Sequence, residues 1–244
     1  MTVIFAQPWG GLGDNLQFTT LPRLYHEKGE EFYISSHNQY RNGEIYEFCW
    51  KNNPYVKGIV NQYPTIGASA PDVQKGVTDN IVSAAEIRHG FSGDGRYPEI
   101  YYEPNLIDEM ADKILVDLSA HTLINNGLDK FYNVEALFDL VDTSVPRENV
   151  RFVTFKNVDI PYLSGGFDFE KQEIQIESIF HYADLIHSSK EYYCLYSGGN
   201  SMAAAIKNKY NSKVKINCFL HGTVSEHLDK AFFIFDNVNY IEVV

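Results

Sequence analysis

The stretch that decides the fold is Trp9-Gly10-Gly11-Leu12-Gly13-Asp14-Asn15-Leu16, near the start of the chain. A short apolar run, Val3-Ile4-Phe5-Ala6, precedes it, and apolar residues at helical spacing follow it. This pattern predicts a strand, a glycine-rich turn and a helix. Glycines let a backbone approach a ligand closely, and the N–H groups that open a helix attract anions. The turn also carries a carboxylate, Asp14, which conflicts with anion binding.

Composition argues against several classes of protein. The 244 residues carry 20 basic and 32 acidic side chains, a net charge of −12, so we expect neither a nucleic acid nor an anionic membrane as partner. We find no signal-peptide pattern and no apolar stretch near the roughly 20 residues that span a bilayer. The eight histidines are dispersed, and no metal site is expected. Three widely spaced cysteines predict buried free thiols, a reducing compartment and a cytoplasmic location: Cys49, Cys194 and Cys218.

The first half of the chain alternates between strand and helix patterns. Strands are expected at Val3–Gln7, Phe32–Ser36 and Val56–Val60, and helices at Asp14–Lys28, Asn42–Asn52 and Val82–His89. The βαβαβ repeat predicts a parallel sheet. The proline-flanked segment Tyr97–Pro104 predicts a connector, so we place a domain boundary near Asn105.

The second half repeats this organisation. Strands are expected at Lys113–Leu118, Val150–Phe155, Tyr192–Tyr196 and Val214–Phe219. Helices are expected at Ile107–Asp112, Val134–Val141, Ile174–Ser188 and Ser201–Lys209. The predicted fold class is therefore α/β with two domains, residues 1–105 and 106–244, each with a glycine turn between a strand and a helix.

The first glycine turn completes no nucleotide-binding fingerprint. Gly11 and Gly13 begin a dinucleotide-binding pattern, but Leu16 stands where a further Gly or Ala is needed. The second strand also ends in Ser35-Ser36-His37, without the acidic residue that binds a ribose. A P-loop is excluded because no Gly-Lys-Ser/Thr follows. A purely structural alternative is a tight turn with Asp14 as the N-cap of the helix.

A second glycine turn, Ser197-Gly198-Gly199-Asn200-Ser201, follows an apolar strand and opens an alanine-rich helix. Its side chains are neutral hydroxyls and an amide, and they accompany the free N–H groups of a helix start. This turn therefore suits a phosphate better than the first one does. The alternative is a helix capped by Ser or Asn after a glycine turn, with no ligand.

The order of these motifs resembles the heptosyltransferase family of ADP-heptose:lipopolysaccharide glycosyltransferases. Gly11–Leu16, followed by Thr19-Thr20-Leu21-Pro22 and Leu24, is similar to the family's Gly-Asp-x-Leu turn and its Thr-x-Pro helix. Pro54–Ile59 looks like its third strand. Ile179–Ile186 and Tyr196–Ala205 are similar to a helix ending in Ala-Asp, an Asp-Ser/Thr-Gly turn and an Ala-rich helix. The glycine-rich opening is also similar to that of certain fucosyltransferases, which share the fold.

The resemblance implies a shortened type-B glycosyltransferase fold, with two Rossmann-like domains facing a cleft. It implies a nucleoside-diphosphate sugar bound by residues 106–244 and an acceptor, a glycan or glycolipid hydroxyl, facing residues 1–105. Departures from the family are the short chain, Tyr196 in place of an acidic residue, and Ser201 or Met202 in place of a histidine. The donor sugar and its nucleotide therefore stay open.

The expected reaction is a metal-independent, inverting glycosyl transfer without a resident cofactor. Asp14 is the expected base for the acceptor hydroxyl. Acceptor-side turn residues are Gly11, Gly13 and Asn15. The developing charge of the leaving diphosphate would be stabilised by the second turn: Ser197, Gly198, Gly199, Asn200 and Ser201.

Further candidate site residues lie in two loops. Ser119, His121 and Asn126 follow the strand Lys113–Leu118, and Glu226, which could hold a ribose, follows Val214–Phe219. Positive charge could come from Arg23 and Lys190, although a solvated surface position is the favoured interpretation for both. Two other classes stay open: a degenerate member that binds nucleotide or sugar without catalysis, and a dinucleotide enzyme such as a nucleotide-sugar epimerase.

Overall fold

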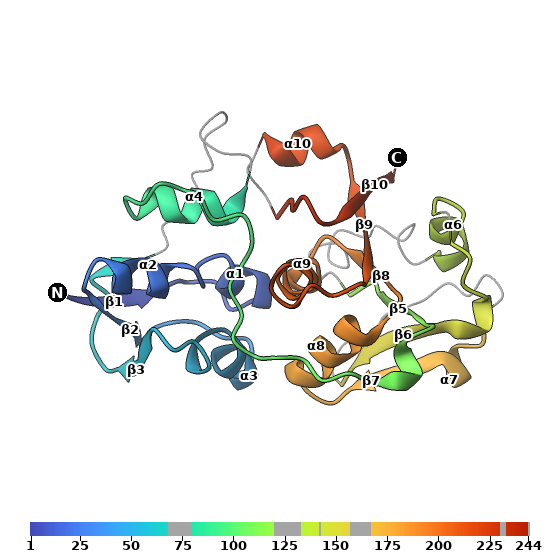
Figure 1. Cartoon of the computed structure of the whole chain (residues 1–244), viewed down its shortest axis with the longest axis horizontal. Helices are drawn as coiled ribbons and strands as arrows, with labels where there is room; N and C mark the ends of the chain where they lie inside the picture. Colours follow the sequence, from blue (N-terminus) through green and yellow to red (C-terminus); the bar gives the residue numbers. More distant parts are fainter. Residues whose placement is uncertain (68–79, 120–132, 142, 157–166, 230–232, 244) are drawn as a thin grey trace. The chain divides into compact units, whose positions relative to one another are not determined.

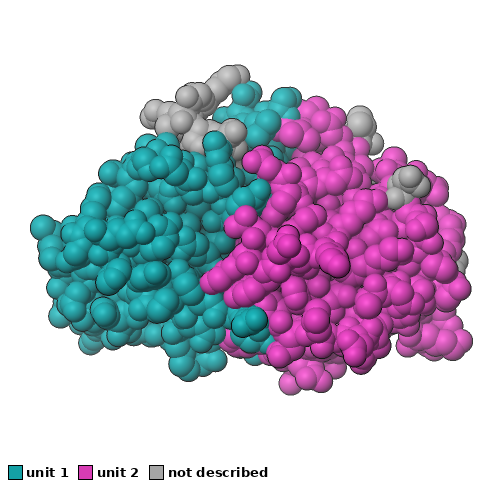
Figure 2. Space-filling view, in the orientation of Figure 1, with its two compact units in different colours: residues 1–103, 225–235 teal, residues 104–224, 236–244 magenta. Residues whose placement is uncertain are grey.

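The computed structural model describes residues 1–67, 80–119, 133–141, 143–156, 167–229 and 233–243. The chain divides into two compact units (Figure 2). Unit 1 comprises Met1–Glu103 and Ser225–Phe235, and unit 2 comprises Pro104–Val224 and Asp236–Val244. Each unit contains its own parallel sheet (Figure 1), in agreement with the predicted α/β class.

Residues 225–235 depart from the single boundary expected near Asn105, because they cluster with the first unit. The Asn80 side chain donates a hydrogen bond to the Ile234 carbonyl at 3.0 Å. The rings of Tyr97 and Phe235 stack at a centroid distance of 6.1 Å. These contacts between residues far apart in sequence attach the returning segment to unit 1.

The sheet of unit 1 has the strand order β3-β2-β1-β4, and its strands are parallel. β1 is Thr2–Ala6, β2 is Glu31–Ser35 and β3 is Val56–Val60, which confirms the predicted βαβαβ start. The short strand β4, Ile66–Gly67, was not expected. α4, Ile81–Arg88, begins at its cap residue Asn80.

An aromatic cluster forms the core of unit 1 around β1. The ring of Phe5 lies 5.1 Å from Phe18, 5.9 Å from Phe32 and 5.6 Å from Trp50, measured between centroids. All four side chains are at most 2% exposed. Edge and offset contacts of this kind add to the hydrophobic gain of burying such large side chains. The cluster therefore fixes the strand that leads into the first glycine turn.

The predicted helix Asp14–Lys28 is divided into α1, Leu12–Leu16, and α2, Leu21–Glu27. Pro22 lies in the first turn of α2, where it has no N–H to offer a continuing helix and its ring would clash with the preceding turn. The Thr19 hydroxyl bonds back to the Leu16 carbonyl at 2.8 Å, which competes with regular helix hydrogen bonds. Both effects interrupt the helix between residues 16 and 21.

The predicted helix Asn42–Asn52 also has two parts. α3, Gly43–Tyr46, begins at Asn42, whose side chain accepts a hydrogen bond from the Ile45 N–H. A π-helical turn, Glu47–Lys51, continues it. This turn buries three consecutive side chains, Phe48, Cys49 and Trp50, each at most 1% exposed.

The sheet of unit 2 has the strand order β10-β9-β8-β5-β6-β7, again with parallel pairs. Its strands are β5 (Ile114–Asp117), β6 (Val150–Phe155), β7 (Glu173–Ile176), β8 (Glu191–Leu195), β9 (Lys215–His221) and β10 (Asn239–Val243). Its helices are α6 (Val134–Phe138), α7 (Phe169–Gln172), α8 (Ile179–Ser188) and α9 (Gly198–Tyr210). Short 3₁₀ turns cover Asp108–Met110 and Arg147–Asn149, and α10 (Val224–Leu228) leads out of the unit.

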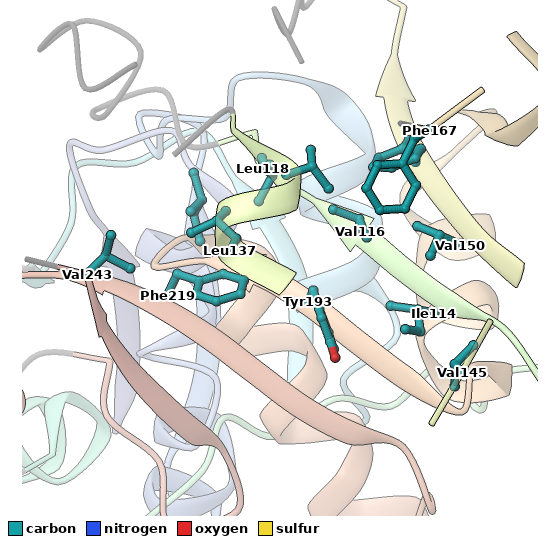
Figure 3. Close-up of a cluster of buried hydrophobic side chains, with 13 residues drawn as sticks. Ile114, Val116, Leu118, Leu137, Val145, Val150, Phe167, Tyr193, Phe219 and Val243 are labelled. Atoms are coloured by element: carbon teal, nitrogen blue, oxygen red, sulfur yellow. The ribbon is translucent and has the colours of Figure 1, made fainter. Parts of the chain in front are cut away.

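Alternate side chains of the central strands face two different layers. Ile114 and Val116 of β5 and Tyr193 of β8 join a hydrophobic cluster with Val134 and Leu137 of α6 (Figure 3). The intervening residues of these strands, among them Asp117 and Tyr192, point to the opposite face because the strand period is two. Tyr182 of α8 reaches them there.

The predicted helix Ile174–Ser188 is wrong in its first third. Glu173–Ile176 forms the edge strand β7, paired with β6, and α8 begins only after Ser178. The Ser178 side chain caps α8 by accepting a hydrogen bond from the His181 N–H at 3.0 Å. Ile174 and Ile176 fit a strand and a helix equally well, so tertiary pairing with β6 decided the structure.

Two further predictions concern the cysteines and membrane spans. Cys49, Cys194 and Cys218 are buried free thiols, as predicted. Cys194 and Cys218 stand opposite each other on β8 and β9. In the described part of the chain, no helix has both the length and the apolar character to cross a membrane.

The Ser178 cap can be tested directly. Replacing Ser178 with Ala leaves the His181 N–H without its partner and should lower the free energy of unfolding by about 1 kcal/mol, whereas Ser178→Asn should retain most of it. Urea denaturation measures both. If Ala and Asn destabilise the protein equally, the hydroxyl does not cap α8.

Candidate functional site

The first turn places Asp14 inside α1 rather than at its cap. Gly11 is the N-cap residue, with extended backbone, and Asp14 is the third residue of the helix. The Asp14 carboxylate accepts a hydrogen bond from the Gly11 N–H at 3.0 Å. The structural alternative, with Asp14 as the N-cap, is therefore wrong by three residues, because the carboxylate reaches back to the cap residue instead of occupying its position.

Gly10 and Gly11 are required by close approaches. A Cβ at Gly11 would lie 2.6 Å from the Asp14 carboxylate, and one at Gly10 would lie 2.9 Å from the Arg41 backbone nitrogen. The Arg41 N–H in turn donates to the Gly10 carbonyl at 2.9 Å. The glycines thus make room for a carboxylate and for the loop after β2.

The surroundings of Asp14 make its carboxylate more basic than an exposed one. Burial raises the pKa of Asp14 above the ordinary value of 3.8, while the Gly11 N–H and the charge of Arg41 partly oppose that shift. A carboxylate with a raised pKa is a better general base near neutral pH than an exposed one. The exposed Arg41 is a residue that the sequence did not single out.

Asn15 has a structural role in this turn. Its side chain is 0% exposed. It donates to the Gly11 carbonyl at 2.9 Å and accepts from Trp50 Nε1 at 2.9 Å and from the Asn38 amide at 3.3 Å. Asn15 thus ties the turn to two segments that follow it in sequence. Gly13 is also buried, within α1.

The second turn joins β8 to α9. Ser197 is the N-cap of α9, and its hydroxyl accepts from the Gly199 N–H at 3.3 Å. The Asn200 amide donates to the Tyr240 hydroxyl at 3.3 Å, and Ser201 is 0% exposed. The helix of 13 residues directs its positive end toward the turn.

A buried carboxylate lies directly beneath this turn. Asp117, at the end of β5, is 2% exposed. One of its oxygens accepts from the Ser119 N–H at 2.8 Å and from the Ser119 hydroxyl, and the other accepts from the Tyr182 hydroxyl, which contacts the Tyr192 hydroxyl. A Cβ at Gly199 would overlap both phenol oxygens. The sequence analysis missed this cluster; its one signal was a carboxylate ending the apolar run Ile114–Val116.

Protonation in this cluster is governed by burial. Burial raises the pKa of Asp117, and hydrogen bonds from Ser119, Tyr182 and Tyr192 oppose that rise. Burial also raises the pKa of Tyr182 and of Tyr192 well above the ordinary phenol value. Both phenols therefore stay neutral and can serve as hydrogen-bond donors at neutral pH.

Both glycine turns lie at positions where strand order reverses. In unit 2 the chain runs outward from β5 through β6 and β7, and then returns to the other side of β5 with β8. In unit 1 the first turn follows β1, which has β2 on one side and β4 on the other. Open parallel sheets bind ligands at such reversals, beyond the carboxyl ends of the strands. The structure thus brings Ser119 and the Ser197 turn to one reversal, between β5 and β8.

The structure describes three of the remaining candidates, Glu226, Arg23 and Lys190. His121 and Asn126 lie outside the described residues. Glu226 is exposed, and it falls in the segment that clusters with unit 1 rather than in the predicted nucleotide domain. Arg23 forms ion pairs with Glu27 and Glu99, each at 2.7 Å.

Lys190 is exposed, in line with the surface alternative. Among the residues that the structure describes, no group of three or more His, Cys, Asp or Glu side chains is arranged to hold a metal ion.

The structural role of Asn15 leads to a stability prediction. Asn15→Leu should leave Trp50 Nε1 without its acceptor, at a cost of about 1–3 kcal/mol for a buried group left unsatisfied, while the Gly11 carbonyl keeps the Asn15 main-chain N–H as a donor. The exposed Asn61 provides a control, since Asn61→Leu should change the free energy of unfolding by less than about 0.5 kcal/mol. Equal losses in urea denaturation would contradict the role given to Asn15.

Comparison with known proteins identifies the fold. No protein-family model and no curated protein matches the sequence. The iron-containing dodecameric glycosyltransferase TibC from enterotoxigenic E. coli H10407 aligns with 98% of this chain at a TM-score of 0.61 and 12% identity. The E. coli ADP-heptose lps heptosyltransferase II aligns with 99% of this chain and 91% of its own, at a TM-score of 0.58 and 11% identity.

A third similar structure is the glycosyl transferase family 9 protein from Veillonella parvula DSM 2008. It aligns with 98% of this chain and 85% of its own, at a TM-score of 0.56 and 8% identity. This chain spans 63% of the length of TibC. The predicted fold is confirmed: the chain has the heptosyltransferase-like, type-B glycosyltransferase fold.

Proposed function

We propose that this protein is a glycosyltransferase that moves a sugar from a nucleoside-diphosphate sugar to a hydroxyl of a glycan or glycolipid. The observation that carries the proposal is the Ser197–Ser201 turn at the reversal between β5 and β8, in a chain with a heptosyltransferase-like fold. A helix start at such a reversal suits a diphosphate. The buried free thiols favour a reducing, cytoplasmic location.

In this proposal unit 2 binds the donor. The diphosphate is the leaving group, and the main-chain N–H groups and positive end of α9 stabilise its developing charge. Ser197, Asn200 and Ser201 surround that helix start, Gly198 adds no side chain that could obstruct a ligand, and Gly199 lets the turn pack against the phenols of Tyr182 and Tyr192. Ser119 borders the same reversal from the end of β5.

Unit 1 supplies the base. The acceptor hydroxyl loses its proton as it attacks the anomeric carbon, and Asp14 takes that proton. A single displacement inverts the anomeric configuration. Because Asp14 and the Ser197 turn belong to different units, the transfer needs both units of the chain.

We propose that the reaction needs no metal ion, since the helix start offers the stabilisation that a divalent cation would otherwise supply. TibC is described as iron-containing, so the point requires its own test. The assay should be run with and without a chelator.

A second candidate function is a nucleotide- or sugar-binding protein without transferase chemistry. One observation favours it: Tyr196 stands where the resemblance leads us to expect an acidic residue. A pure binder releases no nucleoside diphosphate from a sugar nucleotide, whereas a transferase with water as a slow acceptor does.

The test begins with thermal unfolding in the presence of ADP, UDP, GDP or CMP, because a ligand that binds only the folded state raises the melting temperature. Sugar nucleotides with the stabilising base are then incubated with the protein, and release of the nucleoside diphosphate is measured. Stabilisation with release supports the transferase. Stabilisation without release supports the binder. If no nucleotide stabilises the protein and no nucleoside diphosphate is released, the proposed function loses its support.

The role of Asp14 predicts a separation of catalysis from donor binding. Asp14→Asn keeps the size of the side chain but removes its basicity, and should lower turnover by about 10²–10⁴-fold, the usual contribution of a general base. The nucleotide affinity, measured by calorimetry, should stay that of the wild type. Full turnover by the variant would show that another group accepts the proton.

The raised pKa of Asp14 predicts an acid limb in the pH profile. The base works only when ionised, so turnover should fall as the pH drops through a value above 3.8. Arg41 lowers this pKa, and therefore Arg41→Ala should move the limb to higher pH. An unchanged acid limb in Arg41→Ala would mean that the ionisation of Asp14 does not set the limb. The control for loss of a surface charge is Lys57→Ala, since Lys57 is exposed on β3.

A further inference from the structure

We propose that Asp117, Tyr182 and Tyr192 form a positioning network that fixes Ser119 and the Ser197–Gly199 turn relative to each other at the donor site. The inference rests on the proposed function and extends it to residues beneath the site. These three side chains are positioning residues: they set the shape of the Ser197–Gly199 turn and the position of Ser119.

The network joins four elements of unit 2 at one point. Asp117 ends β5, Tyr182 lies on α8, Tyr192 lies on β8, and Gly199 belongs to the first turn of α9. β5 and β8 are neighbours in the sheet, with Asp117 opposite Cys194. The carboxyl ends of the two strands therefore lie side by side, and the Asp117 carboxylate lies between Ser119 and Gly199.

The two carboxylate oxygens of Asp117 accept hydrogen bonds from different groups. The first fixes Ser119 through both its N–H and its hydroxyl. The second accepts from Tyr182, whose hydroxyl contacts that of Tyr192. The two phenol oxygens in turn lie against Gly199, where even a Cβ would overlap them. The position of the α9 start thus depends on the phenols, and theirs depends on the carboxylate.

A buried carboxylate is a costly way to fill space. Asp117 takes part in none of the ion pairs of the described residues, and hydroxyl and N–H donors alone compensate its burial. Loss of solvation for such a group is strongly unfavourable unless its hydrogen bonds are in place. An apolar side chain would pack between β5 and α8 without that cost. What the carboxylate adds is hydrogen bonds that fix Ser119 and, through the phenols, the Ser197–Gly199 turn.

β8 itself offers a matched control. Tyr192 and Tyr193 are adjacent, both are 0% exposed, and they face opposite sides of the sheet. The Tyr193 hydroxyl donates to Glu191 at 3.2 Å, and its ring joins the α6 face (Figure 3). Replacing either tyrosine with Phe removes one buried hydroxyl from the same strand, but only Tyr192→Phe alters the network under Gly199.

The experiment compares Tyr192→Phe, Tyr182→Phe and Tyr193→Phe in the full-length protein. The probe is whichever of ADP, UDP, GDP or CMP stabilises the wild type most, and calorimetry gives its Kd. Tyr192→Phe and Tyr182→Phe should weaken binding about tenfold, equivalent to about 1.4 kcal/mol, and Tyr193→Phe should leave the Kd unchanged. In donor hydrolysis the two network variants should raise KM with kcat retained, the reverse of the split expected for Asp14→Asn.

Asp117→Asn gives a second comparison, because it keeps one acceptor oxygen and loses the other. Its effect on Kd should equal or exceed that of Tyr182→Phe. Equal affinities of Tyr192→Phe, Tyr182→Phe and Tyr193→Phe, with nucleotide still bound by the wild type, would overturn the inference and leave the proposed function standing. A wild type that binds none of the four nucleotides would overturn both.

Discussion

The parallel pairing of β5 with β8 is the constraint on which the donor-side site depends. These strands are far apart in the chain, yet their pairing joins the half β5-β6-β7 of the six-stranded sheet to the half β8-β9-β10. Their carboxyl ends therefore open two loops at one reversal of strand order. The Ser197 turn, Ser119 and the buried Asp117 are brought to one place by this pairing.

The first glycine turn also follows a strand at a reversal of strand order, but it carries a carboxylate, Asp14, in place of neutral donors. Its glycines accommodate the Asp14 carboxylate and the Arg41 backbone, and Asn15 fixes the turn from below. A carboxylate is unsuited to a diphosphate but suited to a hydroxyl that must lose a proton. The division of labour that we propose, with a base on unit 1 and anion stabilisation on unit 2, removes the conflict that the sequence raised.

Local patterns in the sequence were sufficient for both turns and for most central strands. β3 and β6 match their predicted bounds, and α9 follows the second turn as expected. One prediction failed where a distant contact decides the structure, because the edge strand β7 pairs with β6. Another failed at a local feature that periodicity overlooks: Pro22, in the first turn of α2, interrupts the single predicted helix. The Asp117–Tyr182–Tyr192 network could not be predicted, since its members lie up to 75 positions apart and two of them read as ordinary apolar-face residues.

The most direct measurement is an experimental structure of the protein with the nucleoside diphosphate that stabilises it most. The account predicts the diphosphate at the start of α9, within hydrogen-bond distance of main-chain N–H groups of residues 198–200, with the Tyr182–Tyr192 pair unmoved beneath Gly199. A diphosphate bound at the first turn, beside Asp14, would contradict the assignment of the two turns.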